Sequence, residues 1–399
     1  MTAYLIGTID VEDSATYDLY RSFNPSLVEA AGGKYIIKGK PLTKLEGDDF
    51  RSRFVMIEFA SEAALRRFYD STEYAALRPL RQSSAKSSLA LIDMDSDSSD
   101  RTAHQIARFG DDIALTSVTA TMDKLGPNEL RIRPALISVN PIDWKICTGL
   151  LAALPFSLPY TPGCEGVGVI EAVGAQVEGF CPGQRVMAHS SLLRGGWFAD
   201  RVDVDASECA LVPDDLADEK AAALSVALLT ADQSIKLHDG PISRALVIGA
   251  SGSVGSIATA LLSRVTKHVD AICSASNADY VTTLGGHVLP PEEAAQAQYD
   301  FVLDAAGGPV IEAGYRSLAP GGTLVSLVQP VDEDRAKAAS GRAIRYSVKP
   351  NGEKLAALIA QHRSYPEPRI AVTLSLAEVS VALHLCRFGR LRGKILLRP

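Results

Sequence analysis

A glycine-rich turn between an apolar run and a helical pattern is the part of the chain best suited to chemistry. Ala245–Ile248 is typical of a buried parallel strand, and apolar residues recur at helical spacing from Ile257 to Leu262. The small residues between them would let the backbone approach a pyrophosphate, which binds the N–H groups at the start of such a helix. We therefore predict a dinucleotide site with turn contacts from Gly249, Ser251, Gly252, Ser253, Val254 and Gly255.

The residues about twenty positions after this turn indicate which dinucleotide is bound. NAD sites place Asp or Glu there to hold the ribose 2′-OH. This chain instead has Ser274-Ala275-Ser276-Asn277, with no acid before Asp279. A carboxylate would repel a 2′-phosphate, so its absence predicts a preference for NADPH, with Ser274, Ser276 and Asn277 as contacts. Because no Arg or Lys lies in this loop, we expect a distant cation such as Lys394 to help bind the phosphate.

Length and composition predict a soluble protein of two or three domains. The chain has 399 residues, of which 47% are apolar. Its formal charge of −7 argues against nucleic acid or an anionic membrane as partner. No apolar run reaches the roughly 18 residues of a membrane helix, and the first residues suggest a strand, not a signal peptide. Six cysteines without any C-x-x-C indicate neither a disulfide framework nor a four-thiolate zinc site. We expect a cytoplasmic protein that acts on a small molecule.

Residues 1–93 show the pattern of a small α+β domain. Strands and helices are expected in the order β-α-β-β-α-β, which is the ferredoxin-like arrangement. Ser61 is the predicted N-cap of the second helix. The strands are expected at Tyr4–Val11, Lys34–Ile37, Arg53–Phe59 and Leu89–Ile92, and the helices at Ser14–Ala31 and after Ser61.

Short motifs in this region match a known family. They are Tyr17-x-x-Tyr20, Gly32-Gly33-Lys34-Tyr35, Leu45-Glu46-Gly47, Ile57-Glu58-Phe59 and a run from Ser71 to Arg81. On these motifs the region resembles DUF1330, a family of unknown function with a dimeric α/β-barrel fold. The resemblance implies that two such domains pair face to face, giving a homodimer or a higher homo-oligomer. Tyr20, Asn24, Tyr74 and Arg78 are candidates to line a pocket, but core and surface positions in a dimer explain them without any other role, and we favour that explanation.

A polar, acidic stretch at Asp93–Asp100 separates this domain from the rest, and we predict a linker at residues 94–102. Strands are then expected at Gln105–Phe109, Ala114–Val118 and Glu129–Val139. The next motifs are Asn140-Pro141-x-Asp143-x-Lys145 and a G-x-E-x-x-G-x-x-x-x-x-G-x-x-V run from Gly163 to Val177. With them, about 300 residues resemble the medium-chain dehydrogenase/reductase superfamily, in its zinc-free, zeta-crystallin-like quinone oxidoreductase branch.

This resemblance implies an α/β and α+β multidomain fold. A ferredoxin-like domain is followed by a GroES-like β domain, into which a Rossmann nucleotide-binding domain is inserted. The expected boundaries are 1–93 for the ferredoxin-like domain, 103–225 for the GroES-like catalytic domain, 226–355 for the Rossmann domain and 356–399 for the return to the catalytic domain.

The positions that hold zinc in other branches of this superfamily do not suit a metal here. Catalytic zinc needs three protein ligands. Cys164 stands where the family has a His ligand, Asn140 stands at the first family Cys, and Ser225–Thr230 has no Cys, His or carboxylate. We therefore predict no metal and interpret Cys164 as a small buried residue. Without a Lewis acid, alcohol dehydrogenation is disfavoured.

The expected chemistry is hydride transfer from NADPH to an acceptor whose product anion is delocalised, such as a quinone or an α,β-unsaturated carbonyl. The resemblance implies that Asn140 positions the nicotinamide and that Thr230 contacts it. Tyr160 is a candidate proton donor or a simple wall residue. These three are the expected catalytic residues. The loop from Leu150 to Phe156 lacks the Tyr used by related enoyl reductases, which argues against an enoyl thioester. The remaining cofactor contacts expected are Asn140, Lys145, Thr230, Ala305, Ala306, Ser326 and Lys394.

Two other functions fit the same sequence. The chain could be a bifunctional biosynthetic enzyme whose N-terminal barrel catalyses its own step, or a non-enzymatic NADPH sensor. Steady NADPH turnover with a quinone separates an enzyme from a sensor, and a product formed without NADPH consumption points to the barrel.

Overall fold

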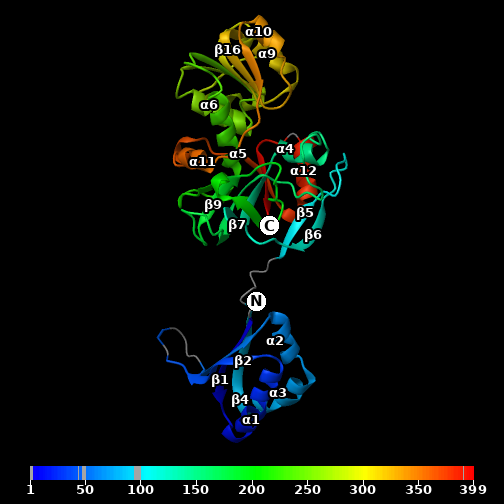
Figure 1. The fold of residues 1–399 in the computed structure, drawn as a ribbon. Coiled ribbons are helices and arrows are strands. Elements are labelled where there is room, and N and C mark those ends of the chain that lie inside the picture. The colour runs from blue at the N-terminus through cyan, green and yellow to red at the C-terminus, as the bar shows by residue number, and fades with distance from the viewer. Residues whose placement is uncertain (1–2, 44, 47–50, 94–99, 390) are drawn as a thin grey trace. The chain divides into compact units, whose positions relative to one another are not determined.

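The computed structural model describes residues 3–43, 45–46, 51–93, 100–389 and 391–399, and the chain divides into two compact units, Met1–Ser99 and Asp100–Pro399 (Figure 1). Residues 94–99 of the predicted linker lie outside the described residues, as does Gly47 of the DUF1330-like motifs. The predicted end of the linker at 102 is wrong, because Asp100–Thr102 already pair with Thr119–Thr121 in a hairpin. Within the described ranges, no helix has the length and apolar character needed to cross a membrane.

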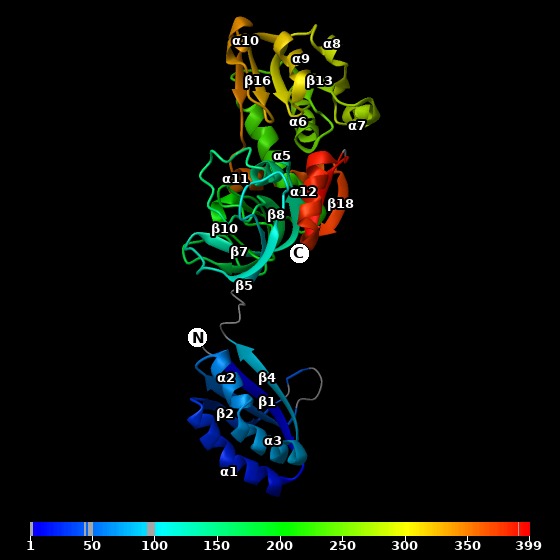
Figure 2. The same ribbon diagram turned by 90° about the vertical axis from the view of Figure 1, so that its right-hand side faces the viewer.

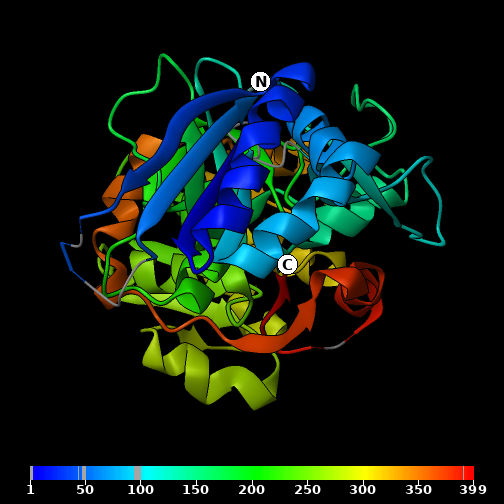
Figure 3. The same ribbon diagram turned by 90° about the horizontal axis from the view of Figure 1, so that it is seen from below.

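The N-terminal unit is an antiparallel sheet with the strand order β2-β3-β1-β4, as the ferredoxin-like prediction requires. Residues of β1 alternate between buried and half-buried positions, so one face of the sheet packs against the helices. Figure 3 shows the dark blue α1 and the light blue α3 running beside the strands. The elements are β1 (Ala3–Val11), α1 (Ser14–Ala30), β2 (Lys34–Pro41), β3 (Arg53–Phe59), α2 (Glu62–Tyr69), α3 (Thr72–Ser84) and β4 (Ala85–Asp93).

One helix of this unit was not predicted separately. Ser61 caps α2 as expected, since its Oγ accepts from the Ala64 N–H at 3.2 Å. The chain then breaks at Asp70, and Ser71 caps α3 by accepting from the Tyr74 N–H at 3.1 Å. Side-chain oxygens at N-caps satisfy helix N–H groups that have no partner inside the helix.

The second unit begins with a β-rich part whose main sheet has the order β11-β9-β8-β7-β19-β18, with β10 also paired to β7. The C-terminal strands return to it, and Ile395 of β19 pairs with Val139 of β7 (Figure 1). The predicted strand at Gln105–Phe109 is wrong: β5 ends at Gln105, and only Ile106 pairs further on, with Tyr160. The strands are β5 (Asp100–Gln105), β6 (Thr116–Thr121), β7 (Glu129–Val139), β8 (Glu165–Val173), β9 (Arg185–His189), β10 (Val202–Asp205), β11 (Cys209–Leu211), β18 (Ile370–Ser375) and β19 (Lys394–Arg398).

The nucleotide-binding part is a parallel sheet with the order β14-β13-β12-β15-β16-β17 (Figure 2). From β12 the chain continues to β13 on one side of it and later reaches β15 on its other side. The carboxyl end of β12 is therefore a switch point, where sheets of this kind bind ligands. The elements are β12 (Arg244–Ile248), α6 (Ser253–Leu262), β13 (His268–Ile272), α7 (Ala278–Thr283), β14 (His287–Val288), α8 (Pro291–Ala294), β15 (Tyr299–Asp304), α9 (Ile311–Arg316), β16 (Leu318–Ser326), α10 (Glu333–Ala338) and β17 (Arg342–Arg345).

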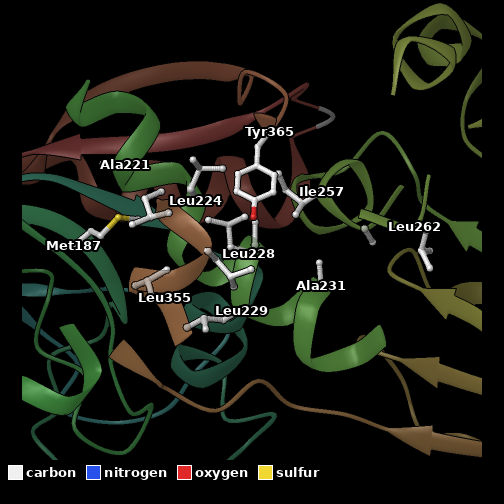
Figure 4. Packing of buried hydrophobic residues seen from close by; sticks show 14 of the residues in the cluster. Met187, Ala221, Leu224, Leu228, Leu229, Ala231, Ile257, Leu262, Leu355 and Tyr365 are labelled. Atoms are coloured by element: carbon white, nitrogen blue, oxygen red, sulfur yellow. The ribbon is translucent and has the colours of Figure 1, made fainter. Parts of the chain in front are cut away.

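A single helix joins these two parts into one unit. α5 (Asp218–Ile235) contacts β8 and β7 on one side and α6 on the other, and the predicted boundary at residue 225 falls inside it. α11 (Gly352–Ile359) packs on α5, and the predicted boundary at 355 falls inside that helix. Figure 4 shows Leu224, Leu228 and Leu229 of α5 packed among Met187, Ile257, Leu355 and Tyr365. Because one core crosses from sheet to sheet, the space between them has fixed walls. The remaining helices are α4 (Pro141–Cys147) and α12 (Val379–Phe388).

Candidate functional site

The glycine-rich turn has the geometry that a dinucleotide needs. Gly249 follows β12 with φ at +82°, in the left-handed region that favours glycine. A Cβ at Gly255 would lie 2.2 Å from the Gly249 carbonyl oxygen, so only glycine lets α6 approach the strand this closely. Gly252 is the N-cap of α6, which leaves the first N–H groups of that helix without a side-chain partner from the cap. These groups fit a pyrophosphate.

Two adjoining cavities meet over this turn. The larger has a volume of about 390 Å³ and lies between the nucleotide-binding part and the β-rich part, while the smaller, of about 200 Å³, extends toward α7 and β18. Both are lined by Gly252 and Ser253. An extended ligand with its middle on the turn can therefore occupy both.

The predicted site residues fall into three groups. The larger cavity is lined by Asn140, Lys145, Thr230, Gly252, Ser253, Val254, Gly255, Ala305 and Lys394, and the smaller by Ser251, Gly252, Ser253 and Asn277. Gly249 lies beside Ala306, since a Cβ at Gly249 would be 3.0 Å from the Ala306 Cβ, and Ser274 and Ser276 form the loop that carries Asn277. Ser326 is buried and donates to Asp304 at 2.8 Å, so its side chain is committed within the fold.

A buried ion pair holds the predicted Asn140 in place. Lys394 Nζ lies 2.7 Å from Glu165 Oε2 and donates to Asn140 Oδ1 at 2.6 Å. Asn140 Nδ2 donates to the same carboxylate at 3.0 Å, and the Val226 N–H donates to the other Glu165 oxygen at 2.7 Å. Glu165 is fully buried and Lys394 is 6% exposed. The amide therefore has one orientation at the cavity wall.

A second carboxyl group below this pair is less well satisfied. Asp143 is fully buried, accepts from the Asn140 N–H at 2.7 Å through Oδ2, and has no partner for Oδ1 within the described residues. Burial raises the pKa of Asp143 to about 7, although the Asn140 N–H and the Lys394 charge act in the opposite direction. It fixes the start of α4, where Asn140 is the N-cap.

Tyr160 is not at the cavity. Its ring packs in the core of the β-rich part, with its centroid 5.1 Å from that of Phe156, and its hydroxyl donates to the Leu192 carbonyl at 2.5 Å. Burial raises the pKa of Tyr160 well above its usual range. The sequence left two roles open for Tyr160, a wall of the cleft or a proton donor in it. Its position away from the cleft supports neither role. It is a core residue.

His189 is a cavity residue that the sequence did not single out. It is 2% exposed, its Nδ1 lies 3.3 Å from the Cys164 carbonyl oxygen, and its Nε2 makes no hydrogen bond to any residue described. Burial lowers its pKa, so the ring is neutral near pH 7. The available signal in the sequence was a polar residue at the end of the strand Arg185–His189. That the His189 side chain points inward follows only from the pairing of β9 with β8.

Two arginines from the C-terminal segment reach the loop after β13. Arg369 donates to Asn277 Oδ1 at 2.9 Å, and its guanidinium carbon lies 3.7 Å from the Tyr280 ring centroid. Arg392 donates to Ser276 Oγ at 2.7 Å. Both line the smaller cavity, and none of its described lining residues is Asp or Glu. Lys394 does not reach this loop, since its ammonium group is held by Glu165 and Asn140, so the expectation that it binds a phosphate here is wrong.

The larger cavity has two cations at its wall besides the paired Lys394. Lys145 and Arg345 line it, whereas no Asp or Glu does so among the residues the structure describes. Burial lowers the pKa of Lys145, and the nearby Arg345 charge lowers it further. Arg345 was not predicted. This end of the cleft favours a neutral or anionic ligand.

The donors expected of a zinc site are not available in this cleft. Burial raises the pKa of Cys164 well above its usual range, which disfavours the thiolate that binds zinc. Both oxygens of Glu165 are already hydrogen-bonded. Over the described parts of the chain, no group of three or more His, Cys, Asp or Glu side chains is arranged to hold a metal.

Comparison with known proteins agrees with this architecture. Family models described as "Domain of unknown function (DUF1330)", "Alcohol dehydrogenase GroES-like domain" and "Zinc-binding dehydrogenase" match residues 2–94, 126–214 and 276–397. The chain is 32% identical over 231 residues to a chloroplastic quinone-oxidoreductase homolog of Spinacia oleracea, which covers 54% of this chain and 70% of that protein. It is 27% identical over 353 residues to a 2-methylene-furan-3-one reductase of Solanum lycopersicum, covering 83% and 88% of the two chains.

Among solved structures, the quinone oxidoreductase from Coxiella burnetii superposes with a TM-score of 0.68 at 24% identity, over 75% of this chain and 99% of the other. At that identity the likeness shows the fold. The predicted GroES-like and Rossmann architecture and the DUF1330-type first domain are thereby confirmed.

Proposed function

Because this chain belongs to the quinone oxidoreductase branch of the medium-chain dehydrogenase/reductase superfamily, we propose that it is a zinc-independent, NADPH-dependent reductase of a quinone or an α,β-unsaturated carbonyl. The oxidoreductase class follows from the family. The cofactor, the independence from zinc and the acceptor class are our proposals. These proposals rest on the side chains that line the cleft. Arginines line its smaller cavity, and among the described residues no group of His, Cys, Asp or Glu side chains is arranged to hold a metal in the larger one.

Cofactor preference is argued from the smaller cavity. The 2′-phosphate of NADPH needs cationic or hydrogen-bond donors, and Arg369 and Arg392 offer guanidinium groups beside Ser276 and Asn277. NADH would instead need a carboxylate to accept from the ribose 2′-OH, and Ser274 stands at that position. The planar stack of Arg369 on Tyr280 also provides a flat surface of the kind an adenine ring contacts.

When bound, NADPH supplies the hydride, and the chain supplies orientation and electrostatics. The Lys394–Glu165 pair fixes the Asn140 amide at the wall of the larger cavity. Thr230 donates to the Val226 carbonyl at 2.5 Å, which leaves its hydroxyl oxygen as an acceptor toward the same cavity. Both side chains are thus held in position before any ligand arrives.

The acceptor class is argued from the charged wall. Reduction of a quinone or enone places negative charge on an oxygen, and Lys145 and Arg345 would stabilise it. Neither needs a metal for this. Since Tyr160 lies in the core, the proton that completes reduction comes from another donor, and solvent at the open end of the cleft can supply it.

The decisive experiment compares kcat/KM for NADPH and NADH with a panel of quinones, enones and enals. We expect NADPH to be preferred at least tenfold, which corresponds to about 1.4 kcal/mol. Equal or better use of NADH would refute the cofactor proposal. Zinc independence is tested by elemental analysis of protein purified without chelator, and activity that a chelator abolishes and zinc restores would refute it. A cytoplasmic location and a homodimer stay predictions from the sequence.

A further inference from the structure

The N-terminal unit encloses a cavity of its own, with a volume of about 90 Å³, between the helix-covered face of its sheet and helices α1 and α3. Its polar lining includes Tyr17, Tyr20, Asn24, Tyr35, Tyr74 and Arg81. The apolar strands of the sheet form its floor. The volume equals about three water molecules, so the cavity admits a small molecule.

Arg81 is a buried cation for which the described residues provide no carboxylate partner. It lies on α3 and is 4% exposed, its Nη1 donates to Ser87 Oγ on β4, and its Nε has no partner in the described part of the unit. No Asp or Glu is among the described residues that line the cavity. Buried charges are normally paired, because an isolated one costs several kcal/mol of desolvation. A guanidinium kept in this setting suits an anion that arrives from outside.

A second buried polar atom lies in the same wall without a partner. Asn24 is 4% exposed and donates from Nδ2 to the Tyr35 hydroxyl at 2.6 Å, while no described residue donates to its Oδ1. The Tyr20 hydroxyl is hydrogen-bonded to Tyr74. Burial raises the pKa of Tyr35 to about 12, so its hydroxyl, which accepts from Asn24, is protonated and able to donate at neutral pH. The cavity thus offers several donors to an anion and one amide acceptor to a hydroxyl group.

Further cations line the cavity nearer its opening. Arg21 pairs with Asp18 at 3.1 Å, and Lys38 Nζ lies 5.0 Å from the Tyr35 ring centroid. Arg53 is the third. A concave site with charges of one sign raises the local concentration of ions of the other sign.

We propose that the N-terminal unit is a binding site for a small carboxylate, whose anionic oxygens accept from Arg81 and whose hydroxyl group donates to Asn24. The site is separate from the reductase cleft, and the proposal stands whether or not the chain reduces quinones. A monocarboxylate of the size of lactate matches the small volume of the cavity and the cationic and polar side chains that line it.

The test is isothermal titration of the full chain with sodium lactate, with uncharged lactamide as the matched ligand. We expect lactate to bind with a Kd of about 1 mM, and lactamide to bind at least tenfold more weakly because it carries no charge. Arg81→Met should weaken lactate binding at least tenfold. Since that change alters a buried side chain, Asn24→Asp is the second variant: it keeps the shape of the wall and repels the anion.

Two matched controls locate the site. Arg51→Met removes a guanidinium that, like that of Arg81, donates to a serine of β4, here to Ser88 Oγ at 2.6 Å, and that is not part of the cavity lining. Arg345→Met removes a cation from the reductase cavity. Both variants should bind lactate as the unaltered chain does. Absence of saturable binding, equal binding of lactamide, or loss of binding in Arg345→Met but not in Arg81→Met overturns the proposal.

Discussion

Each unit of this protein buries a cation at the wall of a cavity, and the two cations are treated differently. Lys394 in the reductase cleft is 2.7 Å from Glu165 and shares Asn140 with it. Arg81 in the N-terminal unit meets a serine hydroxyl, and no carboxylate is among the described residues that line its cavity. A neutralised charge can position a neighbouring group but has little attraction left for a ligand, whereas an uncompensated one gains most when an anion arrives. We therefore infer that Lys394 orients the reductase site, whereas Arg81 recognises a ligand.

The strongest test of this comparison removes the partner of Lys394. Glu165→Gln removes the carboxylate that lies 2.7 Å from the buried ammonium group, and we expect it to lower the free energy of unfolding by about 3 kcal/mol or more. Both tryptophans of the chain, Trp144 and Trp197, lie in the reductase unit, so urea unfolding followed by tryptophan fluorescence reports on that unit alone.

Two controls define the result. Glu312→Gln breaks an exposed pair with Arg335 and should change stability by about 1 kcal/mol or less. Arg81→Met leaves no charged group without a partner, since Arg81 donates to the Ser87 hydroxyl, so hydrogen exchange in residues 1–93 should be no faster than in the unaltered chain. A Glu165→Gln protein as stable as the Glu312→Gln protein would show that the buried pair contributes nothing.

The unsatisfied carboxyl beside the pair predicts a pH effect. Burial raises the pKa of Asp143 to about 7, so the folded state binds its proton more tightly than the unfolded state does. The stabilisation from this group is complete below its unfolded pKa near 4 and is lost as the pH rises through about 7. Asp143→Asn cannot titrate. We therefore expect the stability of this variant relative to the unaltered chain to increase by about 3 kcal/mol between pH 5 and pH 8. Urea curves whose difference does not change with pH would contradict the assignment.

A smaller effect is expected at the arginines of the cofactor end. Arg369→Gln should lower kcat/KM with NADPH about tenfold and leave NADH almost unchanged, because only the 2′-phosphate distinguishes the two. Arg264→Gln is the matched control, since Arg264 stacks on Tyr365 with 5.1 Å between guanidinium and ring centroid and is not part of the cavity lining. Ser274→Asp should also reduce NADPH use about tenfold and improve NADH use. An equal loss with both cofactors would assign Arg369 a structural role.

The sequence predicted those parts of the site that adjacent residues determine. The Gly249–Gly255 turn, the Ser61 cap and the strand order of the N-terminal unit depend on local spacing, and the structure contains each of them. Arg369 and Arg392 were missed because they reach Asn277 and Ser276 from 92 and 116 residues away. Tyr160 precedes Cys164 by only four residues and still points into the core, since the bridge to Ile106 sets its direction. The direction of a side chain and the contacts between residues far apart in the sequence depend on the whole fold, so local spacing does not predict them.

The two units also differ in the faces they leave open. The sheet of the N-terminal unit carries Ile6, Met56 and Ala90 in register on the face opposite its core, and Ile92 on the same face is 41% exposed. Because an apolar face of a sheet is normally covered, we expect residues 1–93 to form a homodimer through it. Sedimentation of the isolated fragment measures this. Replacing Ile6 and Ile92 with Lys should dissociate it, while a monomeric unaltered fragment would rule the dimer out.

The smallest effect is expected when the two units are separated. Each unit has its own core. Asp100 belongs to the reductase unit because it pairs with Thr121 through backbone and side chain, so the cut belongs before residue 100 and not before residue 103, where the catalytic domain was predicted to begin. If Arg81 recognises a ligand of its own, residues 100–399 should keep kcat and KM for NADPH and for a quinone within about twofold of the full chain, a change of only about 0.4 kcal/mol. The same fragment should no longer bind lactate. If instead it binds NADPH normally and loses turnover, the N-terminal unit contributes to the reductase reaction, and Tyr20, Tyr74 and Arg78 become the residues to mutate.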